Sequence, residues 1–155
     1  MSLDLRLSSV LHMLLHLSSS KRPLSSQELA MDLGTHAVVI RRTLGSLRQR
    51  GYVRSGKGNG GGWSMACDPA AITLNDVHRA LGAHSVLALG HRRETPVCTA
   101  EQAVHQALDQ AFSEAENSFT DRLDRMTLAG LLTACGGSPD GLRTASSSQL
   151  PCGPG

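Results

Sequence analysis

The feature that most constrains the fold is the segment 34–67, where a helical pattern runs directly into a glycine-rich turn. Apolar residues recur every three or four positions before Gly51, so the sequence predicts a helix that begins at residue 35 or 36 and ends at about residue 50. Two short runs of strand-forming residues, 52–55 and 63–66, then flank the turn GKGNGGG, which is mostly glycine and tolerates positive φ. This pattern predicts a β-hairpin directly after the helix.

The same segment concentrates positive charge. It contains six of the 15 Lys and Arg residues and none of the 13 Asp and Glu residues, so it carries +6 while the rest of the chain carries −4. The net charge of the whole chain, +2, conceals this segregation. A basic block on a structured element is typical of a surface that binds a polyanion.

Two more helices are predicted before this segment. One apolar face at helical spacing comprises Leu7, Val10, Leu11, Leu14 and Leu15. Ser25 and Glu28 have the spacing of a capping box, and Gly34 ends the short helix that they open. A short helix, a glycine turn and a second helix form the helix-turn-helix pattern, to which the hairpin adds a wing. Because aromatic residues make up only 3%, the core must be aliphatic, which favours a mainly α fold with a small β-hairpin.

The outward face of the third helix has the composition of a DNA-reading surface. At 3.6 residues per turn, Val38, Arg42 and Gln49 lie opposite the apolar side chains. Arginine and glutamine can donate paired hydrogen bonds to a base edge, and valine can contact a thymine methyl group. The wing tip offers side chains for the DNA backbone or the minor groove. The predicted DNA-binding residues are Val38, Val39, Arg41, Arg42, Gln49, Arg54, Lys57 and Asn59.

Other interpretations of the basic segment exist. It can be a solvated basic face, or the chain can be a winged-helix protein-interaction module that binds a partner enzyme. DNA affinity that falls steeply with salt distinguishes DNA binding from both. The glycine run does not match the phosphate-binding loop of a nucleotide-binding enzyme, because residues 63–66 predict a strand where such a loop requires a helix. No acid–base pair stands at a useful spacing, so we expect no catalytic activity.

The C-terminal half is dominated by a long predicted helix. Thr73 and Asp76 cap a short helix before it. Residues 99–126 contain neither Gly nor Pro, and their apolar positions step by three and four: Val104, Leu108, Ala111, Ala115, Phe119, Leu123 and Met126. On a small domain such a helix has no partner face within its own chain, so we expect it to pair with a second copy in a homodimer. A final short helix is predicted over 127–132.

Four regions are therefore expected along the chain. They are a winged helix-turn-helix DNA-binding domain over 1–82, a loop or sensor region over 83–98, dimerisation helices over 99–134 and a disordered tail over 135–155. No apolar run approaches the length of a membrane span, so we expect no membrane partner and a cytoplasmic protein. The four widely spaced cysteines, which form no CxxC pair, fit a reducing compartment.

Three histidines and one cysteine near the long helix are candidate metal ligands. His84, His91, Cys98 and His105 are seven residues apart, but Gly90 and Pro96 prevent one continuous helix that would align them. Scattered loop histidines explain them better than a metal site, although a dimer could combine ligands from two chains. Cys98, just before a helix start, is a candidate redox-sensing thiol, with an inert structural cysteine as the alternative.

Four motifs at consistent distances make the chain resemble the Rrf-two family of bacterial transcriptional regulators. They are THAVVIRRTLGSLRQRGYV at 35–53, GNGGGW at 58–63, ITLNDV at 72–77 and LDRMTLAGLL at 123–132. The resemblance covers roughly residues 5–132. The family includes the iron–sulfur-cluster, nitric-oxide-responsive and cysteine-metabolism repressors.

This resemblance implies a winged helix-turn-helix repressor that binds double-stranded DNA as a homodimer held by the long helix. It also implies that members with an iron–sulfur cluster place three cysteines in the loop before that helix. Here the loop holds only Cys98, so the chain is more similar to a single-cysteine subgroup. We therefore expect no cofactor, because the three-cysteine ligand set is missing.

Overall fold

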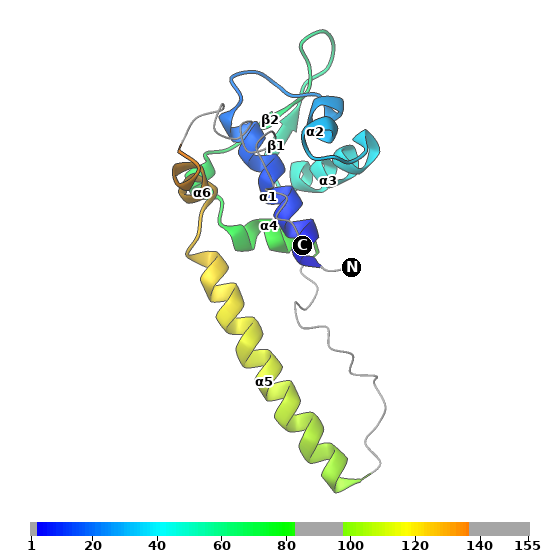
Figure 1. Ribbon diagram of the computed structural model, residues 1–155, viewed down its shortest axis with the longest axis vertical. Coiled ribbons are helices and arrows are strands. Elements are labelled where there is room, and N and C mark those ends of the chain that lie inside the picture. The colour runs from blue at the N-terminus through cyan, green and yellow to red at the C-terminus, as the bar shows by residue number, and fades with distance from the viewer. Residues whose placement is uncertain (1–2, 83–97, 137–155) are drawn as a thin grey trace, which may run out of the picture.

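The computed structural model describes residues 3–82 and 98–136 and shows a small helical body from which one long helix projects (Figure 1). The elements are α1 (Leu3–Ser19), α2 (Ser26–Asp32), α3 (Ala37–Gln49), β1 (Val53–Ser55), β2 (Trp63–Met65), the 3-10 turn η1 (Pro69–Ala71), α4 (Leu74–Ala80), α5 (Thr99–Asp124) and α6 (Leu128–Ala134). The predicted fold class, mainly α with one β-hairpin and a long helix, is confirmed.

Helix α1 lies at the centre of the body (Figure 1). The predicted apolar face is confirmed, with Leu14 fully buried. Met13 and Leu17, which are not among the residues of the predicted face, are also buried, as is His16 at 8% exposure. A helix that is buried on most of its circumference acts as the core around which other elements pack. The same hydrophobic cluster includes Leu29 of α2, Leu44 and Leu47 of α3, and Val77 of α4.

The wing is a two-stranded antiparallel ribbon that is joined to the segment before α2. Val53 pairs with Met65 and Ser55 pairs with Trp63. Leu24 and Trp63 also exchange two backbone hydrogen bonds of 2.9 and 2.8 Å, so a third short extended segment lies beside β2. Gly62 is required at this junction, because a Cβ atom there would lie 2.7 Å from the carbonyl oxygen of Leu24. The base of the wing is therefore fixed to the body.

The C-terminal end of α5 packs into the same core. The backbone N–H of Leu74 donates to Met126, and that of Leu128 donates to Ile72, at 2.9 and 3.0 Å. Leu123 and Leu128 are buried, at 8% and 0% exposure. We expected the apolar stripe of the predicted long helix, the residues at three- and four-residue spacing from Val104 to Met126, to face a second chain. That expectation is therefore wrong at Leu123. The spacing of a stripe shows that it is buried, but not which surface buries it.

Helix boundaries differ from the prediction by two residues. The long helix ends at Asp124, where residue 126 was expected, and the last helix extends to Ala134, where residue 132 was expected. The loop 83–97 and most of the predicted tail lie outside the described residues. Within the described ranges, no helix is both long and apolar enough to cross a membrane.

Candidate nucleic-acid interface

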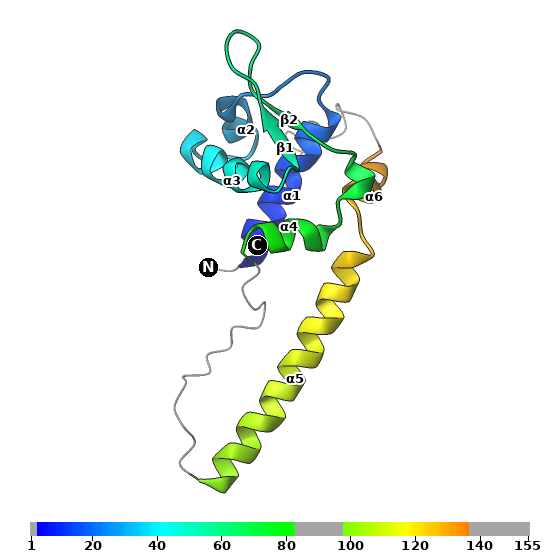
Figure 2. The same ribbon diagram turned by 180° about the vertical axis from the view of Figure 1, so that it is seen from behind.

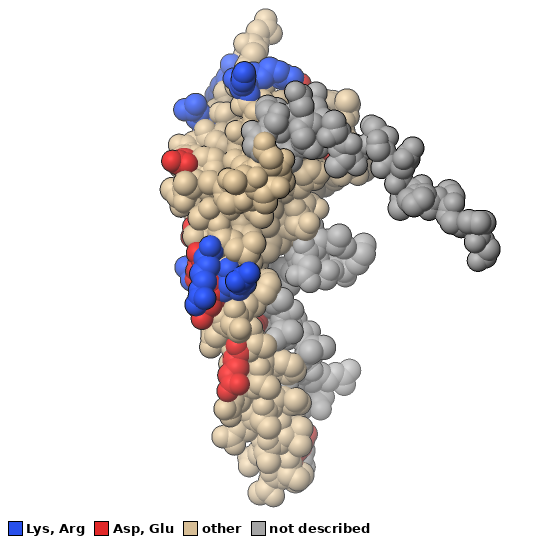
Figure 3. All heavy atoms as spheres, turned by 60° about the vertical axis from the view of Figure 1, so that its left-hand side comes forward, with Lys and Arg blue, Asp and Glu red and all other residues tan. Residues whose placement is uncertain are grey.

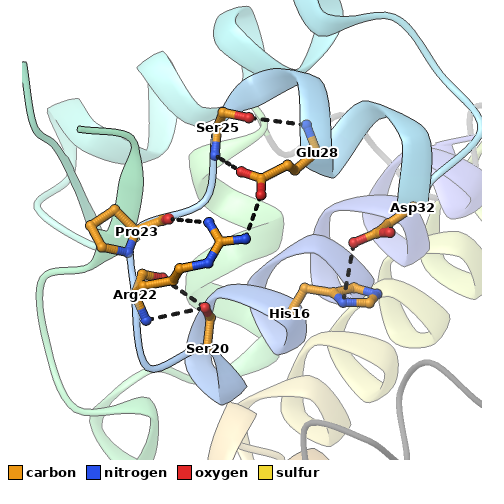
Figure 4. Close-up of polar contacts among 7 residues, drawn as sticks. All are labelled: His16, Ser20, Arg22, Pro23, Ser25, Glu28 and Asp32. Carbon is orange, nitrogen blue, oxygen red and sulfur yellow. Dashed lines mark hydrogen bonds and ion pairs between the residues drawn. The ribbon is translucent and has the colours of Figure 1, made fainter. Parts of the chain in front are cut away.

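A capping network fixes the start of α2, the first helix of the helix-turn-helix (Figure 4). The Ser25 hydroxyl accepts the backbone N–H of Glu28 at 3.1 Å, and a Glu28 carboxylate oxygen accepts the backbone N–H of Ser25 at 2.8 Å. Arg22 donates to the other Glu28 oxygen at 2.5 Å. These hydrogen bonds, the one from Arg22 first and those from Ser25 next, lower the pKa of Glu28 from 4.5 to about 2.

The end of α2 lies beside α1 at a second pair of polar side chains (Figure 4). An Asp32 carboxylate oxygen lies 3.9 Å from Nδ1 of His16, whose Nε2 lies 3.0 Å from Nε2 of His12. Gly34 then adopts φ +61°, in the left-handed region, and the next backbone N–H, that of Thr35, donates to Ala30 at 2.9 Å. This turn orients α3 relative to α2.

Helix α3 buries one face and presents the other to solvent. Ile40, Leu44 and Leu47 are buried at 3% exposure or less, as the apolar spacing predicted. The opposite face includes two large apolar side chains, with Val38 at 66% and Val39 at 50% exposure. The polar residues Arg41, Arg42 and Gln49 are also exposed there. The helix contains no acidic residue, so this face attracts anions without internal neutralisation.

The wing extends the basic surface beyond α3. Lys57 and Asn59 are exposed in the glycine-rich tip. Arg54 is also exposed, and its Nε donates to the hydroxyl of Ser64 across the ribbon at 3.1 Å. Figure 3 shows Lys and Arg gathered beside the wing, whereas basic and acidic side chains lie next to one another lower down, toward α5. In the ribbon view, α3 and the wing both belong to the part of the molecule that lies away from the tip of α5 (Figure 1).

Three contacts at this interface were not predicted from the sequence. Arg48 donates to the hydroxyl of Ser55 at 3.1 Å and also lies over the ring of Trp63. The indole N–H of Trp63 donates to the hydroxyl of Ser26 at 3.0 Å. These residues belong to α3, β1, β2 and α2, so their proximity depends on the tertiary fold. The only signal in the sequence is the single tryptophan next to the glycine turn.

Cys98 lies at the other end of the molecule. It is the N-cap of α5, and its sulfur accepts the backbone N–H of Glu101 at 3.5 Å. The side chain is exposed. The N-terminal end of α5 lies far from the wing and from α3 in both ribbon views (Figure 2). Cys98 is therefore separated from the predicted DNA-binding residues by the length of the helix.

The comparisons with known proteins identify the family. The family model Rrf2, described as "Iron-dependent Transcriptional regulator", matches residues 3–134. The chain belongs to the Rrf2 family. The resemblance to the Rrf-two family is thus confirmed, and the chain is an Rrf2-type transcriptional regulator with a DNA-binding winged-helix fold.

Individual relatives are similar over most of their length. A Bacillus subtilis (strain 168) protein named "Putative HTH-type transcriptional regulator YwnA" is 28% identical, over 82% of this chain and 94% of its own. The solved structure of CymR (YrzC), the global cysteine regulator of B. subtilis, is 21% identical with a TM-score of 0.63, covering 86% of this chain and 96% of CymR. The structure of T. potens IscR is also 21% identical with a TM-score of 0.60, covering 92% of this chain and 88% of IscR. The two structures show a shared fold.

The description of the family names iron, but the residues before α5 do not fit a three-thiolate cluster. The segment 82–99 contains one cysteine, Cys98. Across residues 3–82 and 98–136, no three His, Cys, Asp or Glu side chains are grouped so that they could hold a metal ion. His84 and His91 lie outside these ranges. Iron–sulfur clusters are held mainly by cysteine thiolates, and one such ligand precedes α5, so the function proposed below does not include iron.

The capping network makes the stability of the interface depend on pH. The pKa of Glu28 is about 2 in the folded chain and ordinarily 4.5, so its carboxylate stabilises the fold fully above pH 4.5 and progressively less as the pH falls toward 2. Glu28→Gln should therefore lower Tm at pH 7, and its difference from the wild type should shrink between pH 4.5 and 2. Because 39% of the Glu28 side chain is exposed, we expect an effect below about 1 kcal/mol. Thermal unfolding across this range measures it, and a Tm difference that is undiminished at pH 2 would contradict the charge-based explanation.

Proposed function

We propose that the chain is a homodimeric, sequence-specific DNA-binding repressor without catalytic activity. The observation that carries this proposal is the exposed, acid-free face of α3, which combines Val38 and Val39 with arginine and glutamine side chains. A recognition helix that enters the major groove uses such a mixture, because base edges offer both hydrogen-bonding atoms and thymine methyl groups. A solvated basic face has no need for two exposed valines beside its arginines.

Each predicted residue has a separate role in this proposal. Arg42 and Gln49 read base edges, and Val38 and Val39 contact thymine methyl groups. The positively charged Arg41, Arg54 and Lys57 bind phosphates, and Asn59 enters the minor groove or contacts the backbone.

Helix α5 supplies the proposed dimer contact. Val104 and Leu108 are large apolar side chains with 56% and 43% exposure, and Ala111 and Ala115 continue their line along the helix. A second copy that covered this line would place two recognition helices on one palindromic site, about 34 Å apart. Operator occupancy by such a dimer would exclude other proteins from the site, which is why we propose repression.

We further propose that Cys98 is a redox-sensing thiol. It is exposed at the start of α5, where small oxidants can reach it, and the helix that it caps forms the proposed dimer contact. Peroxide would oxidise this thiol to a sulfenic acid and be reduced to water, and condensation of the sulfenic acid with a second thiol would form a disulfide, release water and alter that helix end. Cys67 differs, because burial and, to a lesser extent, the charge of Asp68 raise the pKa of its thiol. A raised pKa leaves less of the reactive thiolate.

Base readout and phosphate contact should respond differently to mutation. Arg42→Ala should weaken specific binding by about 1–3 kcal/mol and relax the preference at one base position. Lys57→Ala should weaken binding to all sequences equally and lower the slope of log affinity against log salt by about 1. Selection of bound duplexes from a random pool, followed by salt titrations, measures both effects. Affinity without salt dependence would favour the protein-interaction alternative, and identical losses in the two variants would contradict direct readout by Arg42.

The two ends of the α5 stripe should also behave differently. Leu108→Asp places a charge on the exposed face and should produce a folded monomer, detected by sedimentation. Leu123→Ala removes side-chain volume from the core and should lower the free energy of unfolding by about 2–5 kcal/mol, detected by chemical denaturation. A Leu108→Asp protein that remained a dimer would disprove the proposed contact.

The thiol proposal predicts one selective variant. Cys98→Ser should bind DNA normally and lose any response to peroxide, while Cys67→Ser should respond as the wild type does, since the Cys67 thiol is half-buried with a raised pKa. DNA binding before and after peroxide, and after reduction, tests this. An intact peroxide response in Cys98→Ser would assign the response to another residue.

A further inference from the structure

The indole of Trp63 lies where α2, α3 and the wing meet. Its N–H donates to the hydroxyl of Ser26, the first residue of α2, at 3.0 Å. The guanidinium carbon of Arg48, in the last turn of α3, lies 6.0 Å from the ring centroid. Arg48 also donates to Ser55, which is the residue opposite Trp63 in the ribbon, at 3.1 Å. One side chain of the recognition helix therefore contacts both strands of the wing.

The backbone around Trp63 is fixed as firmly as its ring. Two hydrogen bonds join it to Leu24, and Gly62 approaches Leu24 so closely that no side chain would fit. The wing is thus held on one side by the segment before α2 and on the other by Arg48. Arg48 thus adds a polar side-chain link between the recognition helix and the wing strands to the apolar cluster that contains Leu44, Leu47 and Val53.

We propose that Arg48 is a positioning residue that sets the angle between the recognition helix and the wing, and that it binds no phosphate itself. This inference rests on the proposed DNA-binding function. The donors of a guanidinium group lie in a fixed plane, so one hydrogen bond to Ser55 and one aromatic contact restrict the orientation of the side chain. Because its guanidinium group is already bound to Ser55 and Trp63, Arg48 differs from Arg41 and Lys57, for which we propose phosphate contacts.

The angle matters because, in the proposed complex, the recognition helix enters the major groove while the wing reaches the minor groove or the backbone of the same duplex. A wing that lacked the Arg48 contacts and shifted relative to α3 would still carry its charge, so non-specific attraction would persist. Specific binding would weaken, because the recognition helix and the wing would no longer fit the same site together. Loss of Arg48 should therefore reduce the ratio of specific to non-specific affinity, whereas loss of a phosphate contact reduces both alike.

The first test needs no DNA and uses Trp63, the one tryptophan of the chain, as reporter. Arg48→Met keeps the length and helix propensity of the side chain but removes the guanidinium group. It should raise the acrylamide quenching of Trp63 fluorescence, because one face of the ring loses its cover. Arg50→Met is the matched control, because Arg50 is exposed at the end of the same helix and should leave quenching at the wild-type value. Unchanged quenching in Arg48→Met would overturn the proposal, whether or not the chain binds DNA.

The second test measures binding to a selected duplex and to a random duplex at several salt concentrations. Arg48→Met should lose about tenfold in specific affinity, with the salt slope unchanged, while Lys57→Met lowers the slope by about 1. Arg48→Lys keeps the charge but not the planar guanidinium group. Its specific affinity should therefore be nearly as low as that of Arg48→Met. Full rescue by lysine, or a slope lowered as in Lys57→Met, would show that Arg48 contacts phosphate and would overturn its positioning role. Absence of DNA binding in the wild type would instead disprove the proposed function.

Discussion

The burial of α1 is the constraint on which the rest of the structure depends. Its apolar side chains lie in one cluster with those of α2, α3, α4 and α6, and Leu14 is completely enclosed. Because Leu44 and Leu47 must also enter this cluster, the rotation of α3 about its axis is fixed, and the arginine- and valine-bearing face is turned outward. The hydrophobic core thus decides which side chains of α3 are available to bind a ligand.

The extent to which this arrangement could be predicted varies with the range of the interactions. The Ser25–Glu28 and Thr73–Asp76 capping boxes are local, since each joins residues three positions apart, and both occur in the structure. The division of α3 into a buried and an exposed face followed from helical periodicity for the same reason. By contrast, the hydrogen bond between Trp63 and Ser26 joins residues 37 positions apart, and no sequence pattern encodes it.

Leu123 shows a different limit of sequence reasoning. Its spacing along the helix is identical to that of Leu108, yet Leu108 is 43% exposed and Leu123 is buried in the core. Periodicity reports which side of a helix is apolar, and the path of the chain decides what covers that side. The decisive contacts are those of the following turn, where Met126 and Leu128 form backbone hydrogen bonds with the start of α4 and the residues just before it.

These contacts also determine how α5 can communicate with the DNA-binding body. At its C-terminal end the helix is held by the Asn75–Asp124 hydrogen bond of 2.8 Å and by the edge contact of 6.1 Å between the rings of Phe119 and His78. Its 26 residues span about 39 Å, so the N-terminal end of this rod-like helix lies far from the body to which the C-terminal end is attached. In the proposed dimer, a chemical change at Cys98 would act on the pairing of two such rods. Because each rod is fixed to its own winged helix, a change in pairing would alter the spacing of the two recognition helices. Such a mechanism requires rigidity at the base of α5 and reactivity at its tip, and it requires no cofactor between them.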